Sequence, residues 1–299
     1  MSREVHGILL LDKPLGLSSA AAVARVKRLF GAAKAGHTGS LDPLAEGLLP
    51  VCFGEATKFG AHLLDADKTY RVVARLGERT ASADLESAVI ERRELPPFSL
   101  EAIEGAFAAF PRQYDQVPPM HSAIKQDGRP LYEYARAGID RPREPRRIRL
   151  HELRPIGYRA PDLEFLVRCS KGAYIRVLAE DLAASLGTLA HLIALRRTAV
   201  APFADGPYWT LEALEAMSPS DRTAVLKPVD AALGAWRPLR LPCGTAEALR
   251  QGRSVEIGDP TPGPVRLYVE GSGFLGVGAV HEGGRLVPER LISATANPA

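Results

Sequence analysis

The sequence predicts an α+β protein with a larger domain of strands and helices and a smaller, β-rich C-terminal domain. Short apolar or alternating segments, typical of strands, are interspersed with segments whose apolar residues recur every three to four positions, as on one helix face. After about residue 235, short apolar pieces separated by glycines are typical of a small barrel. We therefore expect two domains, residues 1–233 and 234–299.

The first predicted elements lie before residue 60. The segment VHGILLLDKP predicts a buried strand ending in a turn, because Pro14 cannot continue a strand ladder. A helix should follow, since Ser18 or Ser19 can cap it and Gly31 can end it. Its expected buried face consists of Val23, Val26, Leu29 and Phe30. The stretch AGHTGSLDPLAEG is rich in turn residues and predicts a loop before a second strand, LLPVCF.

Three helices and two further strands are expected between residues 68 and 187. The alternation in TYRVVARLG and the apolar run in LEFLVRCS predict the strands. Helical spacing predicts helices over residues 100–110, 130–137 and 174–187. The last of these keeps its apolar period up to Gly187, a residue suited to a helix C-terminus.

Composition excludes several classes of protein. The chain is 46% hydrophobic and 24% charged with a formal net charge of +3, unlike a disordered or strongly basic tail protein. Cys52, Cys169 and Cys243 are too far apart for a disulfide framework or a C-x-x-C zinc or redox site. Because there is also no apolar run long enough to cross a membrane, we expect a cytoplasmic protein.

Basic residues suggest a polyanionic partner. Residues 141–154 contain six arginines and two glutamates, which makes this the densest basic stretch. A solvated face is the ordinary interpretation of such residues, and contact with nucleic-acid phosphates is the functional one. The candidates for phosphate contacts are Lys125, Arg129, Arg146, Arg147, Arg196 and Arg197.

Several single residues could carry chemistry. Asp42 precedes Pro43, which favours an extended backbone and an accessible carboxylate, although an Asx turn is the commoner role of such an aspartate. Tyr70 offers a ring for stacking and a hydroxyl for hydrogen bonding, while strand tyrosines more often belong to the core. Arg176 could be an ordinary surface cation, while an arginine that meets Asp42 would keep it ionised. Spacing alone therefore indicates no more than a nucleic-acid binder.

Longer motifs resolve these alternatives through a family resemblance. The string GHTGSLDPLAEGLLPVCFGEATKF resembles, nearly end to end, the catalytic loop of the TruB-type tRNA pseudouridine synthases. Four more segments occur in the order found in that family: GILLLDKPLGLSS, KTYRVVARLGERTASAD, VPPMHSAIKQDGRPLYEYARAG, and CSKGAYIRVLAEDL leading to LRRT. Together these motifs cover residues 7–203.

The resemblance implies an isomerase that needs neither cofactor nor metal and converts the uridine at tRNA position 55, in the T loop, to pseudouridine. It makes Asp42 the nucleophile, paired with Arg176, and Tyr70 the residue that stacks on the extruded base. It also implies that His37, Tyr174 and Leu195 line the substrate site, and that Asp84 has a supporting role. Attack on the uracil ring, attack on the sugar and a glycal route all remain open.

The resemblance also implies an architecture and partners. We expect a pseudouridine-synthase fold, with a central mixed, mainly antiparallel sheet flanked by helices. An insert of about residues 117–147 should clamp the T-arm stem-loop of tRNA, and residues 234–299 should form a PUA-like RNA-binding barrel. The expected protein is a monomer without an obligatory protein partner. The alternatives are a guide-RNA-dependent synthase and a tRNA-folding chaperone without essential chemistry.

Overall fold

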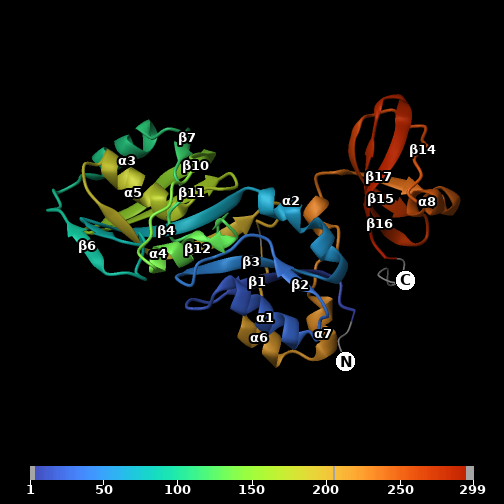
Figure 1. The fold of residues 1–299 in the computed structure, drawn as a ribbon, viewed down its shortest axis with the longest axis horizontal. Coiled ribbons are helices and arrows are strands. Elements are labelled where there is room, and N and C mark those ends of the chain that lie inside the picture. The colour runs from blue at the N-terminus through green and yellow to red at the C-terminus, as the bar shows by residue number, and fades with distance from the viewer. Residues whose placement is uncertain (1–3, 205, 294–299) are drawn as a thin grey trace.

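A computed structural model describes residues 4–204 and 206–293. The outermost residues of both predicted domains, 1–3 and 294–299, therefore lie outside the described residues. Two sheets dominate the described chain, a large one built from residues before 201 and a smaller one after 236 (Figure 1).

The larger sheet has eight strands among the described residues, in the order β1-β3-β12-β4-β11-β10-β7, with β2 beside β3. Only the β3–β12 pairing in this sheet is parallel. The prediction of a mixed, mainly antiparallel sheet is thereby confirmed. The strands are β1 (Gly7–Lys13), β2 (Ala35–His37), β3 (Ala45–Phe53), β4 (Lys68–Leu76), β7 (Gln113–Gln116), β10 (Arg146–Arg159), β11 (Asp162–Cys169) and β12 (Ala190–Val200).

Helices flank this sheet. At one end α1 contacts β2 and β3, and α6 contacts β1; at the other, α3 packs on β10 and α5 on β12 (Figure 1). The helices of this part are α1 (Ser19–Leu29), α2 (Gly60–Asp65), α3 (Leu100–Ala109), α4 (Leu131–Arg136), α5 (Ile175–Ser185), α6 (Leu211–Ala216) and α7 (Pro219–Ala224). Within the described ranges, none of the helices combines the length and apolar character that a membrane crossing requires.

Local sequence explains most of these boundaries. Ser18, rather than Ser19, caps α1, since its hydroxyl accepts a hydrogen bond from the amide of Ala21. Gly31 follows this helix with a φ of +62°, a conformation that glycine adopts without strain. Strand β4 buries alternate residues, as its sequence predicts.

Several strands lay outside the sequence predictions, among them β2, β10 and the central strand β12. Strand β10 contains most of the arginine-rich stretch, and its inward residues Ile148, Leu150 and Leu153 are buried among exposed arginines. In this strand, buried apolar residues alternate with exposed ones, and a bulge interrupts the alternation. The many arginines made this strand pattern hard to recognise in the sequence. Strand β2 is only three residues long and lies within the glycine-rich segment.

The second sheet lies at the C-terminal end of the described chain and curls around its own apolar core (Figure 1). Its strand order is β13-β15-β16-β17-β14, and helix α8 (Cys243–Arg250) packs against β14 and β17. Phe59 and Leu233 join Phe274 in a shared cluster that links this sheet to the rest of the molecule. The strands are β13 (Arg237–Leu241), β14 (Val255–Glu256), β15 (Gly263–Val269), β16 (Gly273–Val280) and β17 (Arg285–Leu291). This arrangement agrees with the predicted PUA-like fold.

Small elements complete the chain. Strands β8 (Lys125–Gln126) and β9 (Arg129–Pro130) form a hairpin ahead of α4, and both lie in the predicted insert. The remaining elements are the strand pair β5 (Glu78–Thr80) and β6 (Val89–Arg92) and the 3-10 turns η1 (Gly54–Phe59), η2 (Ala231–Leu233) and η3 (Glu282–Gly284).

Candidate active site

A pocket of about 280 Å³ opens on the larger sheet between the loop of residues 38–44, strands β4 and β12, and the start of α5. The structure brings together in its lining Asp42, Tyr70, Tyr174, Arg176 and Leu195. Ser122 and Ala123 of the predicted insert line it as well. Five of the six residues predicted for catalysis or substrate binding thus share one cavity, although they come from distant parts of the sequence.

Asp42 and Arg176 form the central ion pair of this pocket. The Nη2 atom of Arg176 lies 2.9 Å from Oδ2 of Asp42. The Arg176 side chain is 6% exposed, whereas that of Asp42 is 43% exposed. The pair therefore presents a carboxylate to the cavity and keeps the guanidinium behind it.

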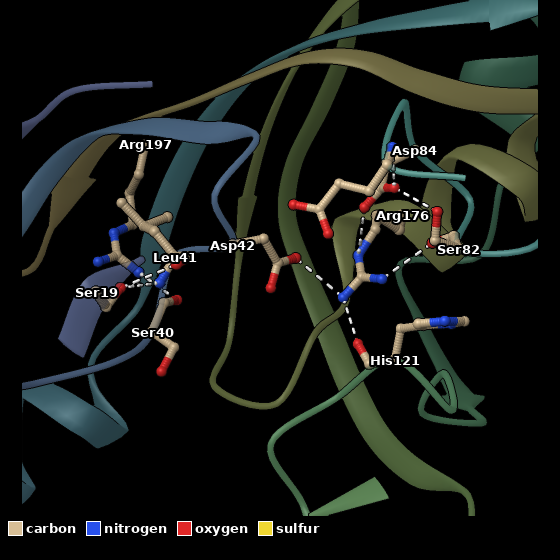
Figure 2. A network of polar contacts seen from close by, with 10 residues as sticks. Ser19, Ser40, Leu41, Asp42, Ser82, Asp84, His121, Arg176 and Arg197 are labelled. Atoms are coloured by element: carbon tan, nitrogen blue, oxygen red, sulfur yellow. Dashed lines mark hydrogen bonds and ion pairs between the residues drawn. The ribbon is translucent and has the colours of Figure 1, made fainter. Parts of the chain in front are cut away.

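Further contacts fix the Arg176 guanidinium (Figure 2). It donates hydrogen bonds to the carbonyl of Ser82 (3.0 Å) and to that of His121 (2.7 Å), and its Nε lies 3.7 Å from the buried carboxylate of Asp84. Asp84 in turn accepts a hydrogen bond from the Ser82 hydroxyl. Because the planar guanidinium has donors in fixed directions, these partners determine where Asp42 is held.

Gln116, at the end of β7, holds the start of α5. Its side-chain oxygen accepts a hydrogen bond from the Tyr174 amide at 2.7 Å, and its nitrogen donates to the Tyr174 carbonyl at 3.1 Å. Sequence reasoning missed Gln116, since a lone glutamine before an insert carries no spacing signal. Tyr174 is the N-cap residue of α5, but its side chain makes no capping hydrogen bond. The side-chain amide of Gln116 binds the backbone of Tyr174 instead.

Tyr70 and Leu195 supply the apolar wall. Tyr70 points inward from β4 and Leu195 from the adjacent β12, and both side chains are 8% exposed. Burial raises the pKa of the Tyr70 hydroxyl, with nearby Arg197 opposing the rise. Near neutral pH the hydroxyl is therefore protonated and can donate a hydrogen bond to a bound base.

His37 lies on β2 and is not among the residues that line the pocket, in contrast to the prediction that it lines the substrate site. Burial and the nearby Arg197 charge both lower its pKa, so the imidazole is neutral at pH 7. Among the described residues its Nδ1 atom is buried without a hydrogen-bond partner.

Arg197 requires a correction of the phosphate-contact prediction. Its side chain is 1% exposed, and its guanidinium donates hydrogen bonds to the carbonyls of Leu48 (2.7 Å), Gly39 (3.0 Å) and Ser40 (3.4 Å). A contact with an RNA backbone requires an exposed cation, and Arg197 is instead committed to the loop that carries Asp42. Sequence alone could not distinguish it from Arg196, which precedes it on β12, pairs with Asp12 and has a side chain that is 37% exposed.

The other basic candidates lie outside the pocket lining. Lys125 and Arg129 lie in the β8–β9 hairpin, while Arg146 and Arg147 begin β10. Arg147 lies 3.3 Å from Asp115, and both side chains are more than half exposed. Exposed ion pairs of this kind contribute little to stability, so such arginines can exchange a carboxylate for a phosphate.

Two buried lysines near the site were also missed. Lys13 donates hydrogen bonds to the Pro14 and Leu17 carbonyls, and Lys68 to carbonyls at the end of α2. Burial lowers the pKa of each ammonium to about 8. Lys68 lines the pocket, and the Asp42 carboxylate acts on Lys13 through its charge.

Comparison with known proteins agrees with this geometry. Residues 27–175 match the model of the TruB family pseudouridylate synthase N-terminal domain. Residues 176–234 match the tRNA pseudouridylate synthase B C-terminal domain, and residues 238–292 match the pseudouridine synthase II TruB C-terminal domain. A tRNA pseudouridine synthase B from Azoarcus sp. (strain BH72) is 48% identical over 97% of this chain and 96% of its own length. The chain belongs to the TruB family of tRNA pseudouridine synthases. It is therefore an isomerase that forms pseudouridine in tRNA.

Other relatives extend the comparison. The tRNA pseudouridine synthase B of Ralstonia nicotianae (strain ATCC BAA-1114 / GMI1000) is 49% identical over 97% of this chain and 95% of its own length. Among solved structures, a Cbf5–Nop10–Gar1 complex contains a chain with a TM-score of 0.72 and 22% identity, covering 96% of this chain and 84% of that chain. At that identity the likeness shows the fold, which confirms the predicted pseudouridine-synthase architecture.

Proposed function

We propose that this TruB-family enzyme isomerises the T-loop uridine at position 55 of tRNA, with Asp42 as its nucleophile. The observation that carries the proposal is the Asp42–Arg176 pair, in which a half-exposed carboxylate faces the pocket while a buried guanidinium holds it at 2.9 Å. The choice of position 55 rests on the resemblance of the catalytic loop to its family.

The chemistry that the residues must support is a rearrangement within one nucleotide. The bond between uracil N1 and ribose C1′ breaks, the uracil rotates, and a bond between C5 and C1′ forms. The proton leaves C5 and N1 gains one, so atoms and electrons balance without water. Asp42 supplies the nucleophile, and the buried Leu195 wall keeps water from capturing the intermediate.

The target base must leave the T loop to reach this cavity. Unstacking a base costs a few kcal/mol, and an aromatic ring can replace part of the lost stacking. Tyr70 offers a ring and a protonated hydroxyl at the pocket wall, which suits the proposed role.

The rest of the tRNA would contact surfaces outside the pocket. We assign the clamping of the T arm to residues 117–147, since Ser122 and Ala123 already reach the cavity from that insert. Arg146 and Arg147 stand at its end and suit backbone phosphates. Residues 234–299 would act as an RNA-binding module, and the enzyme would work as a cytoplasmic monomer without a guide RNA.

The substitution Asp42→Asn tests the assignment of the nucleophile. It should abolish turnover while leaving the tRNA dissociation constant within about tenfold, equivalent to about 1.4 kcal/mol, because the amide keeps the shape but not the charge. Single-turnover assays and filter binding on the same preparation measure both quantities. Retained turnover, or a much larger loss of affinity, would refute a purely catalytic role.

A chaperone without essential chemistry makes the opposite prediction. In that case tRNA folding would be accelerated equally by the wild type and Asp42→Asn, and neither would form pseudouridine. A guide-dependent enzyme would form product only after a guide RNA is added. An assay of pseudouridine formation, run with and without an added guide RNA, therefore distinguishes both alternatives from the proposed function.

A further inference from the structure

The loop that carries Asp42 lacks regular secondary structure. Residues 38–44 form neither helix nor strand, so few backbone hydrogen bonds within a regular element fix them. Catalysis nevertheless demands that the carboxylate be placed to within a fraction of an ångström, since a displacement of about 1 Å can cost about 100-fold in rate. Groups outside the loop must therefore hold it.

Arg197 holds the loop from the β12 side. It lies on the strand next to β4, in register with Tyr70, and next to Gly47 on the parallel strand β3. Its guanidinium donates to the Gly39 and Ser40 carbonyls and, at 2.7 Å, to that of Leu48 on β3. One buried side chain thus ties the segment just before Asp42 to the sheet.

Ser19 holds the same segment from the α1 side. Its hydroxyl accepts a hydrogen bond from the Leu41 amide at 2.7 Å and donates one to the Leu41 carbonyl at 2.9 Å (Figure 2). The side chain is 4% exposed and lies 22 residues before Leu41 in the sequence. Ser19 therefore fixes both backbone groups of the residue that immediately precedes Asp42.

We propose that Ser19 and Arg197 are positioning residues for the reaction, holding the backbone of Gly39–Leu41 so that Asp42 meets both Arg176 and the substrate. This inference rests on the proposed role of Asp42 as nucleophile. Neither side chain reacts: Ser19 acts through the loop, and Arg197, which also borders the pocket beside Tyr70, holds the same loop. The contacts come from two different elements, α1 and β12, and converge on three consecutive residues of the loop.

The neighbouring serine provides a matched control. Ser18 caps α1 through the Ala21 amide, whereas the Ser19 hydroxyl bonds to the loop at Leu41. Ser18→Ala should lower the melting temperature by a few degrees and leave the single-turnover rate unchanged. Ser19→Ala should slow the single-turnover rate by about 10- to 100-fold and leave the tRNA dissociation constant within about threefold.

Arg197→Lys tests the other side of the loop. Lysine keeps the charge but cannot span three carbonyls with fixed directions, so the rate should again fall by about 10- to 100-fold with little change in affinity. Arg75→Lys is the control, because Arg75 lies on β4, pairs with Asp162 and does not line the pocket. Circular dichroism and melting temperature establish that each variant is folded.

The outcomes separate this inference from the proposed function. If Asp42→Asn is inactive while Ser19→Ala and Arg197→Lys keep rates within threefold of their controls, the positioning role is overturned and the nucleophile stands. If Asp42→Asn remains active, the proposed function itself fails. If Arg197→Lys does not fold, Ser19→Ala alone decides, since its rate either falls below that of Ser18→Ala or refutes the proposal.

Discussion

At the scale of single residues, the site depends on an ion pair whose two side chains are buried to different degrees. Arg176 is buried and satisfied by two carbonyls and two carboxylates, while Asp42 remains half open to the cavity. A buried cation with several partners is rigid, because losing any of them leaves a desolvated charge. In the proposed mechanism, the exposed carboxylate is free to react while the buried guanidinium keeps it in place.

Gly47 is a residue whose substitution should affect stability. Its φ of +98° suits glycine, and a Cβ atom there would lie 2.3 Å from the Arg197 carbonyl oxygen. Gly47→Ala should therefore lower the free energy of unfolding by at least about 1–3 kcal/mol. Urea unfolding measures this value. Gly36→Ala on the neighbouring strand β2 should change the free energy of unfolding much less, because a Cβ added there meets no atom within 4 Å beyond its chain neighbours.

At the scale of elements, helix α5 combines an end that borders the pocket with a partly buried acidic middle. Ile175, Leu178 and Leu182 anchor it to the core, and Arg176 leaves its first turn toward the pocket. Glu180, on the same helix, has its pKa raised from 4.5 to about 7, chiefly by burial. Ionised Glu180 therefore destabilises the folded state, and the size of this effect depends on pH.

The direction of this dependence follows from the two protonation states. Between pH 4.5 and about 7 the folded chain retains a proton on Glu180 that the unfolded chain loses, so stability falls as pH rises through that window. Glu180→Gln should raise the free energy of unfolding at pH 8 by about 1–2 kcal/mol, because solvent partly screens the carboxylate and reduces the gain. At pH 4 the same substitution should leave the free energy of unfolding nearly unchanged. Thermal unfolding across pH, with the exposed Glu104→Gln of α3 as control, checks this; an equal gain at pH 4 and 8 would contradict it.

Strand β10 is the element proposed to meet the RNA backbone. The double substitution Arg146→Gln with Arg147→Gln should weaken tRNA binding and reduce the slope of log affinity against log salt concentration by about 1–2. Fluorescence anisotropy at several salt concentrations measures the slope. The matched pair Arg79→Gln with Arg92→Gln, on the β5–β6 hairpin, should leave it unchanged. An unaltered slope in the β10 variant would exclude phosphate contacts there.

At the scale of the whole molecule, the chain brings together groups that lie far apart in the sequence. The pocket draws on residues from Gly39 to Arg197, and the strand order places β4 and β12 side by side at its centre. The C-terminal sheet joins this body through a separate cluster around Phe59 and Phe274. The pocket is thus formed by the topology of the sheet rather than by any one segment of the sequence.

This topology explains what the sequence could predict. The motifs around Asp42, Tyr70 and Arg176 are local and dense, so the family resemblance identified residues that the structure places in one pocket. The roles of Ser19 and Arg197 depend on contacts across 22 and more than 150 residues, which no local pattern encodes. Arg196 and Arg197 show the limit most clearly, because the alternation of β12 buries Arg197 and leaves Arg196 partly exposed.

The most direct test of the proposed function compares the wild-type protein with Asp42→Asn. The purified enzyme is incubated with an unmodified tRNA transcript, without guide RNA, added protein or cofactor, and pseudouridine is mapped at single-nucleotide resolution. The proposed function predicts conversion of the T-loop uridine at position 55 by the wild type and none by Asp42→Asn. Binding of the transcript without pseudouridine at that position, or equal conversion by both proteins, would contradict it.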